Sequence, residues 1–233
     1  MRVLGIVPSA GKGKRIGGDK PYLLIKDKPV LAHTLISLES LPFLSRIILV
    51  VEKSRIRFCE QEIIKRYGLK KPYEVIEGGK ERFDSVYRGL TRIGKEEMVF
   101  IHDGVRPLLS AEIGEKLLRA GRIYKAATIG FPCSETVKEI KKGMFVKKTL
   151  ERKRIYLIQT PQVFQRDLLI QAYKEARKRG KKANDDAELV EQIGHPVKVI
   201  RGEYRNIKIT YPEDLIFAQE MLSRRRMVLT EEQ

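Results

Sequence analysis

A short glycine loop follows the first apolar segment of the chain, and its residue types suit a polyphosphate. The loop runs Ser9-Ala10-Gly11-Lys12-Gly13-Lys14-Arg15, and Lys20 comes soon after it. Glycine and alanine remove side-chain bulk, so backbone N–H groups can approach a ligand closely. The cations add positive charge in the same turn. A plain strand–loop–helix connection with a solvated basic face is the alternative interpretation.

Two better-known glycine loops are excluded by single positions. A dinucleotide fingerprint that started at Gly11 would need glycine at position 16, where the chain has Ile16. A Walker A loop that started at Gly13 would need lysine at position 19 and serine or threonine at position 20. The chain has Asp19 and Lys20 there, so this loop belongs to neither class.

A second group of chemically useful residues follows an apolar segment at residues 98–101. Asp103 at the end of a strand could hold Mg²⁺, with water and substrate phosphates as the other ligands, or could simply form a turn. Gly104 lets a ligand approach the backbone, and Arg106 either pairs with phosphate or holds the loop. His102 is expected to be a partly buried packing residue. The sequence has no Ser-His-Asp arrangement and no histidine cluster with metal-ligand spacing.

A third glycine segment, Gly78-Gly79-Lys80-Glu81-Arg82, opens a predicted helix. Its backbone amides, together with Ser85, could contact a nucleobase edge or a sugar, although a helix start can also need flexible glycines. Two further helix starts fit capping boxes, Asp185 with Glu188 and Thr210 with Glu213.

These loops must be positioned by the elements between them, which alternate between strand and helix. The predicted strands are residues 3–7, 47–51, 73–76, 98–101 and 126–131, and the predicted helices are residues 29–40, 56–67, 82–93 and 111–124. Short Val/Ile-rich strands without strict alternation are typical of a sheet covered on both faces. The succession predicts an α/β fold with a mostly parallel sheet flanked by helices. Ligands of such sheets bind beyond the carboxyl ends of the strands, where all three loops fall.

The alternation breaks after Pro132. Residues 135–140 and 144–150, around Lys141-Lys142-Gly143, predict a β-hairpin with few apolar residues. An isolated hairpin is only marginally stable, so we expect this arm, at about residues 133–155, to project and pack on a second subunit. The alternative is a hairpin folded back on its own sheet. Predicted helices at 167–179, 185–193 and 212–225 and a strand at 197–200 complete the chain.

Composition narrows the choice of partners. The 233 residues suit a single domain, 1–233, and carry a net charge of +17. The cations are spread along the chain without interleaved aromatic side chains, so we expect no nucleic-acid partner. No apolar run approaches the roughly 20 residues of a membrane helix, which predicts no membrane partner. Cys59 and Cys133 form no CxxC pair, and a cytoplasmic location is expected.

Six segments together resemble the 2-C-methyl-D-erythritol 4-phosphate cytidylyltransferases of the non-mevalonate isoprenoid pathway. They are residues 8–15, 20–22, 78–82 with Ser85, 102–107, 160–162 and 206–215. They occur in family order, span nearly the whole chain and are specific only in combination. The resemblance implies a Rossmann-like nucleotidyltransferase fold, a homodimer joined by the arm, and transfer of CMP from CTP to 2-C-methyl-D-erythritol 4-phosphate with release of pyrophosphate.

The resemblance also implies a role for each matched residue on the CTP side. Asp103 would hold Mg²⁺ or another divalent cation. The CTP phosphates would be held by Ala10, Gly11, Lys12, Gly13, Arg15 and Lys20. Gly79 and Ser85 would contact cytosine or ribose, and Gly104 would also border the nucleotide.

The acceptor side would combine two subunits. Arg106, Thr160 and Lys208 would line it, and Thr136 and Arg152 would reach in from the arm of the other subunit. Asn184 replaces the threonine that opens an acidic triplet in family members and would take its contact with the acceptor hydroxyls. Ser9 replaces a usual alanine, with little expected consequence.

Two alternatives remain open from the sequence. A cytidylyltransferase for ribitol 5-phosphate, or for another polyol phosphate, shares most of these motifs. A basic nucleic-acid-binding protein with a degenerate transferase fold would explain the charge. The retained Lys20, Asp103 and Lys208 argue against degeneration.

Overall fold

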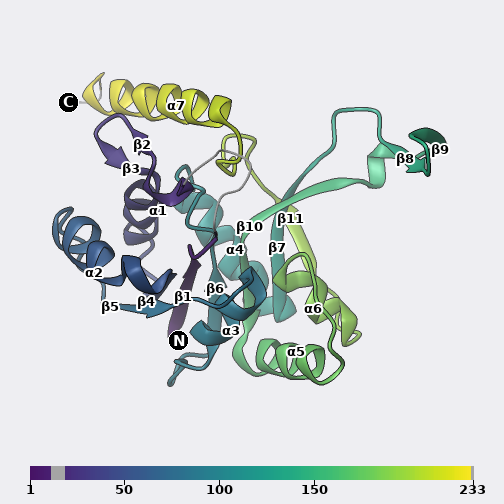
Figure 1. Ribbon diagram of the computed structural model, residues 1–233, viewed down its shortest axis with the longest axis horizontal. Coiled ribbons are helices and arrows are strands. Elements are labelled where there is room, and N and C mark those ends of the chain that lie inside the picture. Colours follow the sequence, from purple (N-terminus) through teal and green to yellow (C-terminus); the bar gives the residue numbers. More distant parts are fainter. Residues whose placement is uncertain (12–18, 232–233) are drawn as a thin grey trace.

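A seven-stranded sheet forms the centre of the computed structural model, which describes residues 1–11 and 19–231, with side chains as far as residue 223. The strands are β1 (Val3–Pro8), β4 (Leu44–Val51), β5 (Tyr73–Glu77), β6 (Met98–Ile101), β7 (Ala126–Pro132), β10 (Tyr156–Gln165) and β11 (Lys198–Arg201). Their order is β11-β7-β10-β6-β1-β4-β5 (Figure 1). β10 runs antiparallel to both of its neighbours, and the other pairs are parallel. The predicted α/β fold with a mostly parallel sheet is therefore confirmed.

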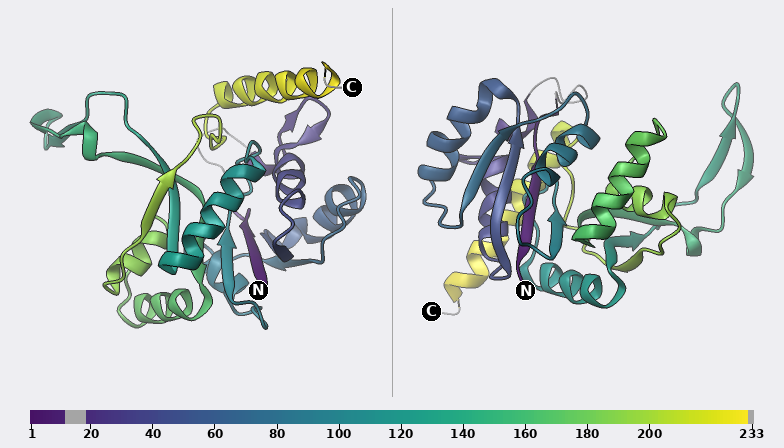
Figure 2. Two further views of the ribbon diagram at one scale, coloured as in Figure 1. Left: turned by 180° about the vertical axis from the view of Figure 1, so that it is seen from behind. Right: turned by 90° about the horizontal axis from the view of Figure 1, so that it is seen from below.

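Helices cover both faces of the sheet (Figure 2). The long helices are α1 (Val30–Glu39), α3 (Arg82–Leu90), α4 (Ala111–Tyr124), α5 (Arg166–Lys178) and α7 (Pro212–Glu231), and the shorter ones are α2 (Ile56–Phe58) and α6 (Asp186–Gln192). α1, α2 and α4 contribute to one hydrophobic cluster and α3, α5 and α6 to the other. None of the helices in the described ranges is both long and apolar enough to cross a membrane.

The pleat of β1 explains why its sequence is a continuous apolar run. Val3 and Val7 belong to the cluster on one face, while Leu4 and Ile6 belong to the cluster on the other. All four are fully buried. A strand covered on both faces has no solvent side, so apolar residues occupy successive positions.

A third, smaller cluster attaches the C-terminal helix to the hairpin at residues 24–29, the start of α1 and the loop after β6. α7 packs through Ala218 against Ile25 and Val30, next to the small hairpin of β2 (Leu24–Ile25) and β3 (Lys28–Pro29). Ile209 belongs to the same cluster, and its N–H donates to the carbonyl of Val105 at 2.9 Å. The segment before α7 is thereby held against the loop that follows β6.

The strand β10 is absent from the sequence prediction. Its centre contains the cis Thr160–Pro161 peptide bond, and its register against β7 shifts between Gln159 and Gln162. Proline and buried glutamine in a strand centre oppose the usual strand signal. The predicted helix at 56–67 is also divided, since α2 continues as a π-helix over Cys59–Lys65.

The arm is a separate two-stranded sheet of β8 (Lys138–Lys141) and β9 (Phe145–Thr149). It projects from the central sheet (Figures 1 and 2), as expected, and is not folded back on that sheet. Met144, Phe145 and Val146 at its end are exposed. Packing of this arm on a second subunit stays a prediction.

Candidate active site

The loops after β1, β5 and β6 border one cavity of about 400 Å³. This confirms that the three loops meet at the carboxyl ends of the strands. The lining residues are Pro8, Ser9, Ala10, Gly11, Lys20, Pro21, Gly79, Lys80, Glu81, Arg82, Ser85, Asp103, Val105 and Lys208. Lys12, Gly13 and Arg15, assigned above to CTP, lie outside the described residues.

A second cavity of about 290 Å³ lies beside the first and shares three lining residues with it: Arg82, Asp103 and Lys208. Its other lining residues come from the loop after β6, from β10 and from the start of α6: Arg106, Ile158, Gln159, Thr160, Gln162, Asn184 and Asp185. Two ligands could therefore sit on either side of one charged boundary.

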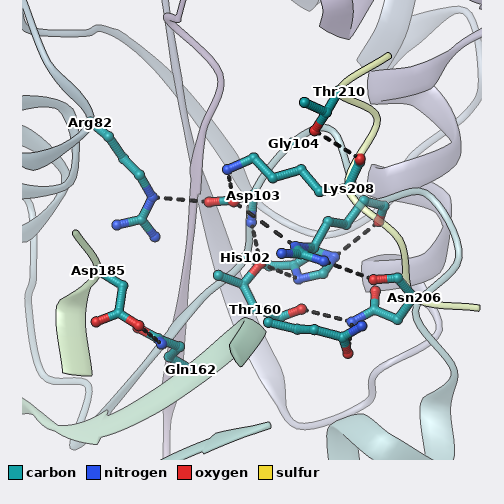
Figure 3. Close-up of polar contacts among 12 residues, drawn as sticks. Arg82, His102, Asp103, Gly104, Thr160, Gln162, Asp185, Asn206, Lys208 and Thr210 are labelled. Atoms are coloured by element: carbon teal, nitrogen blue, oxygen red, sulfur yellow. Dashed lines mark hydrogen bonds and ion pairs between the residues drawn. The ribbon is translucent and has the colours of Figure 1, made fainter. Parts of the chain in front are cut away.

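Asp103 is the centre of this boundary (Figure 3). Its Oδ1 accepts from Nε of Arg82 at 3.0 Å, and its Oδ2 accepts from Nζ of Lys208 at 2.7 Å, with Nε of Arg106 at 4.0 Å. Its side chain is only 7% exposed. Burial would raise the pKa of the Asp103 carboxyl, but the three cations hold that pKa well below its usual range. Asp103 is thus ionised among an excess of positive charge.

His102 anchors the loop and does not act as a base. It is fully buried, whereas partial burial was expected. Its ring nitrogens lie 3.0 Å from the carbonyl of Arg106 and 3.3 Å from Oγ1 of Thr160. Burial lowers the pKa of His102 to about 4, so the ring is neutral at physiological pH.

The segment that carries Lys208 is held by two hydrogen bonds of Asn206, two residues before it. Arg106 donates from Nη1 to the carbonyl of Asn206 at 2.8 Å. Nδ2 of Asn206 donates in turn to the carbonyl of Thr160 at 2.9 Å. Arg106 is therefore a buried link between loops as well as a lining residue of the second cavity.

Lys20 also lines the first cavity and is largely buried. Its Nζ donates to the carbonyl of Thr210 at 3.2 Å. The backbone that carries it is held through Tyr22, whose hydroxyl lies 3.6 Å from Sγ of Cys59. Arg55 covers the Tyr22 ring at 4.8 Å and pairs with Asp19. Together these contacts hold the backbone on either side of Lys20 in place.

The glycines after β5 are required by packing. A Cβ on Gly78 would lie 2.4 Å from Cβ of Ala10, so the loops after β1 and β5 touch only because residue 78 is glycine. Gly79 and Ser85 line the first cavity as predicted. Here, however, the Gly79 N–H donates to Oγ of Ser85 at 3.1 Å, which engages both polar groups.

Gly104 is required by packing. A Cβ at this position would lie 1.9 Å from Oγ of Ser9, so glycine permits the contact with Ser9, while its approach to the nucleotide stays a prediction. Gly104 lines neither of the two cavities. The buried Ser9 hydroxyl has no hydrogen-bond partner among the described residues.

The residues predicted for the acceptor divide into two places. Thr160 and Asn184 line the second cavity, where Nδ2 of Asn184 donates to Oε2 of Glu188 at 2.9 Å. Thr136 and Arg152 lie in or beside the projecting arm and line neither cavity of their own chain. Nη1 of Arg152 donates to the carbonyl of Ser134 at 3.0 Å.

Sequence reasoning missed three residues around this boundary: Arg82, Gln162 and Asp186. Arg82 and Gln162 stood in segments that carried the family resemblance, but they received no role. Asp186 followed Asp185, whose predicted cap is confirmed because its Oδ1 accepts from the N–H of Glu188 at 2.9 Å. The predicted Thr210–Glu213 box is wrong.

Asp214 takes the place of Glu213 at the start of α7. Its Oδ2 accepts from the N–H groups of Thr210 and Tyr211 at 2.7 and 2.8 Å. A carboxylate one position further along thus satisfies the free backbone donors of the helix start.

The donor set suits a particular kind of metal binding. Within the described ranges, no three His, Cys, Asp or Glu side chains are grouped to hold an ion. Among the described residues, Asp103 is the carboxylate that lines both cavities, while Glu81 lines only the first and Asp185 only the second. That fits Mg²⁺, which commonly takes one or two carboxylates and completes its shell with phosphates and water.

Fold and site together define a class of enzyme. A mostly parallel sheet flanked by helices carries, at its carboxyl edge, two adjoining cavities. The cations Arg82 and Lys208 stand between them around the buried Asp103. Among the described residues, the boundary shared by the two cavities holds no serine, cysteine or histidine. The arrangement suits direct transfer between two phosphates, as in a nucleotidyltransferase.

Comparison with known proteins identifies the family. The family model of 2-C-methyl-D-erythritol 4-phosphate cytidylyltransferase matches residues 3–224. An enzyme of that name from Alkaliphilus metalliredigens is 42% identical over 228 residues, which are 97% of this chain and 95% of the relative. The crystal structure of 4-diphosphocytidyl-2C-methyl-D-erythritol synthase from Anaerococcus prevotii has a TM-score of 0.84 and 34% identity, covering 95% of this chain and 98% of that one. The chain belongs to the 2-C-methyl-D-erythritol 4-phosphate cytidylyltransferase family.

The anchor beneath Lys20 yields a testable prediction. Burial raises the pKa of the Cys59 thiol to about 11, so at pH 8 only roughly one molecule in a thousand carries the reactive thiolate. We expect native Cys133→Ser protein to react with dithionitrobenzoate only on unfolding, when one thiol is released. A Cys59→Ala protein, which keeps the half-buried Cys133, is the matched comparison. A fast-reacting thiol in native Cys133→Ser protein would contradict the buried anchor.

Proposed function

We propose that the chain transfers CMP from CTP to 2-C-methyl-D-erythritol 4-phosphate, the reaction for which its family is named, with CTP in the first cavity and the acceptor in the second. The observation that carries this assignment is the shared boundary of Arg82, Asp103 and Lys208. It puts both phosphates beside the same cations. The products are 4-diphosphocytidyl-2-C-methyl-D-erythritol and pyrophosphate.

The reaction is a direct displacement. An oxygen of the acceptor phosphate forms a bond to the α-phosphorus of CTP, and the bond from that phosphorus to the oxygen bridging to the β-phosphate breaks. Pyrophosphate leaves with the electron pair. A phosphate monoester has its second pKa near 6, so it is largely ionised at neutral pH and needs no strong base. The neutral, fully engaged His102 is consistent with that.

Catalysis then consists of positioning and charge neutralisation. Two anions repel each other, so cations must face them from both sides. Lys20 approaches CTP from within the first cavity, and Lys208 stands between the two ligands. Thr160 and Arg106 border the acceptor. Lys12, Gly13 and Arg15 are assigned to the CTP phosphates by family resemblance.

Asp103 is proposed as the protein ligand of Mg²⁺. The bound ion would neutralise charge on the triphosphate, whose oxygens and water would complete its ligands. Each carboxylate oxygen already accepts from a cation and has a second lone pair. Asp103 therefore holds Arg82 and Lys208 in place as well.

A homodimer and a cytoplasmic location complete the proposal. The exposed apolar end of the arm, with Phe145 and Val146, supports burial against a second subunit. Arg152 and Thr136 would then reach the partner's acceptor cavity. Cys59 and Cys133 are free thiols, as is common in a reducing compartment.

The direct test is an acceptor assay. Purified protein with CTP and Mg²⁺ is given 2-C-methyl-D-erythritol 4-phosphate or ribitol 5-phosphate in parallel, and pyrophosphate release is measured. We expect release with the methylerythritol phosphate and at least about tenfold less with ribitol 5-phosphate. Faster release with ribitol 5-phosphate would transfer the assignment to that acceptor, and no release with either would reject it.

Removing either lysine should slow the reaction without unfolding the protein. Loss of one donor aimed at developing charge typically costs on the order of 10²–10³ in rate, so we expect Lys20→Ala and Lys208→Ala each to lose at least that much kcat. The matched control is Lys198→Ala on β11, which lies away from both cavities. Circular dichroism checks the fold, and near-wild-type turnover of either variant would refute its role.

Asp103→Asn should change the response to magnesium. The amide keeps the shape but loses the charge, so we expect the Mg²⁺ concentration for half-maximal activity to rise about 10- to 100-fold, the range usual for altered metal surroundings. Asp167→Asn changes an exposed aspartate and serves as the control. An unchanged Mg²⁺ titration of Asp103→Asn would count against metal ligation.

A further inference from the structure

Arg82 lines both cavities and is one of the cations at their shared boundary. It is the first residue of α3, which begins where the glycine loop after β5 ends. Figure 3 shows its side chain extending toward Asp103 at the boundary. A cation that faces two sites for anions is placed to act on both.

The guanidinium is held at two of its three nitrogens. Nε donates to Oδ1 of Asp103 at 3.0 Å, and Nη2 donates to Oδ2 of Asp186 at 2.7 Å. Among the residues that the structure describes, none accepts a hydrogen bond from Nη1. The side chain is 27% exposed, in contrast to 7% for Asp103 and 0% for Asp186. We therefore assign Nη1, the guanidinium nitrogen without an acceptor in the described part of the chain, to the part of Arg82 that faces the two cavities.

Asp186 is itself immobilised on the side away from Arg82. Its Oδ1 accepts from the hydroxyl of Tyr173 at 2.5 Å. Its N–H and that of Ala187 each donate to Oε1 of Gln162 at 3.2 Å. A fully buried carboxylate is costly unless it is paired and hydrogen-bonded. The hydrogen bonds from Tyr173 and to Gln162 hold Asp186 in place, and Asp186 in turn orients the guanidinium of Arg82.

Arginine suits this place better than lysine would. Its planar fork can keep one nitrogen on Asp186 while another donates to a phosphate oxygen, and it remains protonated throughout. Lys208 supplies a single ammonium to the same boundary. Arg82 thus offers a directed donor at the point where the two ligands must meet.

We propose that Arg82 is a catalytic residue of the transfer: its Nη1 donates to the non-bridging oxygens of the α-phosphoryl group as that group passes between the cavities, with Asp186 and Tyr173 as positioning residues. The inference rests on the proposed function. The acceptor oxygen–phosphorus bond forms as the bond to the leaving pyrophosphate breaks, and no proton moves to or from Arg82. The guanidinium neutralises the negative charge on the non-bridging oxygens of the α-phosphoryl group, which is greatest in the transition state.

The first experiment compares Arg82→Ala and Arg82→Lys with Arg88→Ala, an exposed arginine on the same helix. We expect kcat to fall about 10²- to 10³-fold in both Arg82 variants, because lysine cannot hold Asp186 and the phosphoryl group together. KM for each substrate should change less than about tenfold. Arg88→Ala should match wild type. Wild-type kcat in Arg82→Lys would contradict the claim that a guanidinium must bind Asp186 and the phosphoryl group at the same time.

Chemical rescue separates a catalytic role from a structural one. Guanidinium added to Arg82→Ala should restore turnover in a saturable manner and should not restore Lys208→Ala. If Arg82→Ala unfolds because Asp186 is left unpaired, the double variant Arg82→Ala with Asp186→Asn removes both charges and is assayed instead. A lowered melting temperature with unchanged kcat, or a loss of kcat that guanidinium does not restore, would overturn the proposal.

Tyr173→Phe tests the positioning residues. It removes one donor to Asp186 and keeps the ring that stacks on Phe83 at 4.8 Å. We expect kcat to fall about tenfold with both KM values preserved, the effect of one lost hydrogen bond to a charged group. Unchanged kcat would exclude Tyr173 from positioning.

Wild-type protein in the same assay separates the two levels of inference. If wild type releases no pyrophosphate from CTP and 2-C-methyl-D-erythritol 4-phosphate, the proposed function fails and the role of Arg82 fails with it. If wild type turns over and Arg82→Ala equals it, only the role of Arg82 is rejected.

Discussion

The site depends on one buried carboxylate that must be paired. Asp103 lies at the end of β6 with 7% of its side chain exposed, and its charge is tolerable there only among cations. Those cations come from separate parts of the chain: Arg82 from the start of α3, Arg106 from the loop itself and Lys208 from the segment before α7. The carboxylate therefore joins its own loop to two distant elements, the start of α3 and the segment before α7, and positive charge remains in excess around it.

The antiparallel strand β10 completes this arrangement from below. It lies between β6 and β7, and Thr160 and Gln162, two positions apart, both line the second cavity. Thr160 accepts from the N–H of Asp103 through Oγ1 at 2.9 Å, while Gln162 holds the start of α6 and so Asp186. One strand thus holds the backbone of Asp103 and also supports Asp186, which pairs with Arg82.

Much of this could be predicted from the sequence, because buried parallel strands leave continuous apolar runs and the glycine loops stand directly after them. The convergence of Gly79, Lys20 and Asp103 on one cavity followed from that pattern. The strand β10 could not be predicted, since Pro161 and Gln162 interrupt it. The pairing of Arg82 with Asp186 spans 104 residues and has no periodic signal. The role of Gly104 was also hidden, because only the folded chain shows that Ser9 packs against it.

A net charge of +17 could have been spread over the surface without creating any site, since exposed cations are screened and pair weakly. Lys20 and Lys208 differ from such surface cations because specific contacts hold the segment of chain that carries each of them. Tyr22 holds the first against the π-helix, and Asn206 holds the second against β10. These two sets of contacts are connected by the hydrogen bond from Lys20 to the carbonyl of Thr210, which lies on the segment that carries Lys208. That segment therefore links the supports of both lysines, because it carries Lys208 and also accepts the hydrogen bond of Lys20.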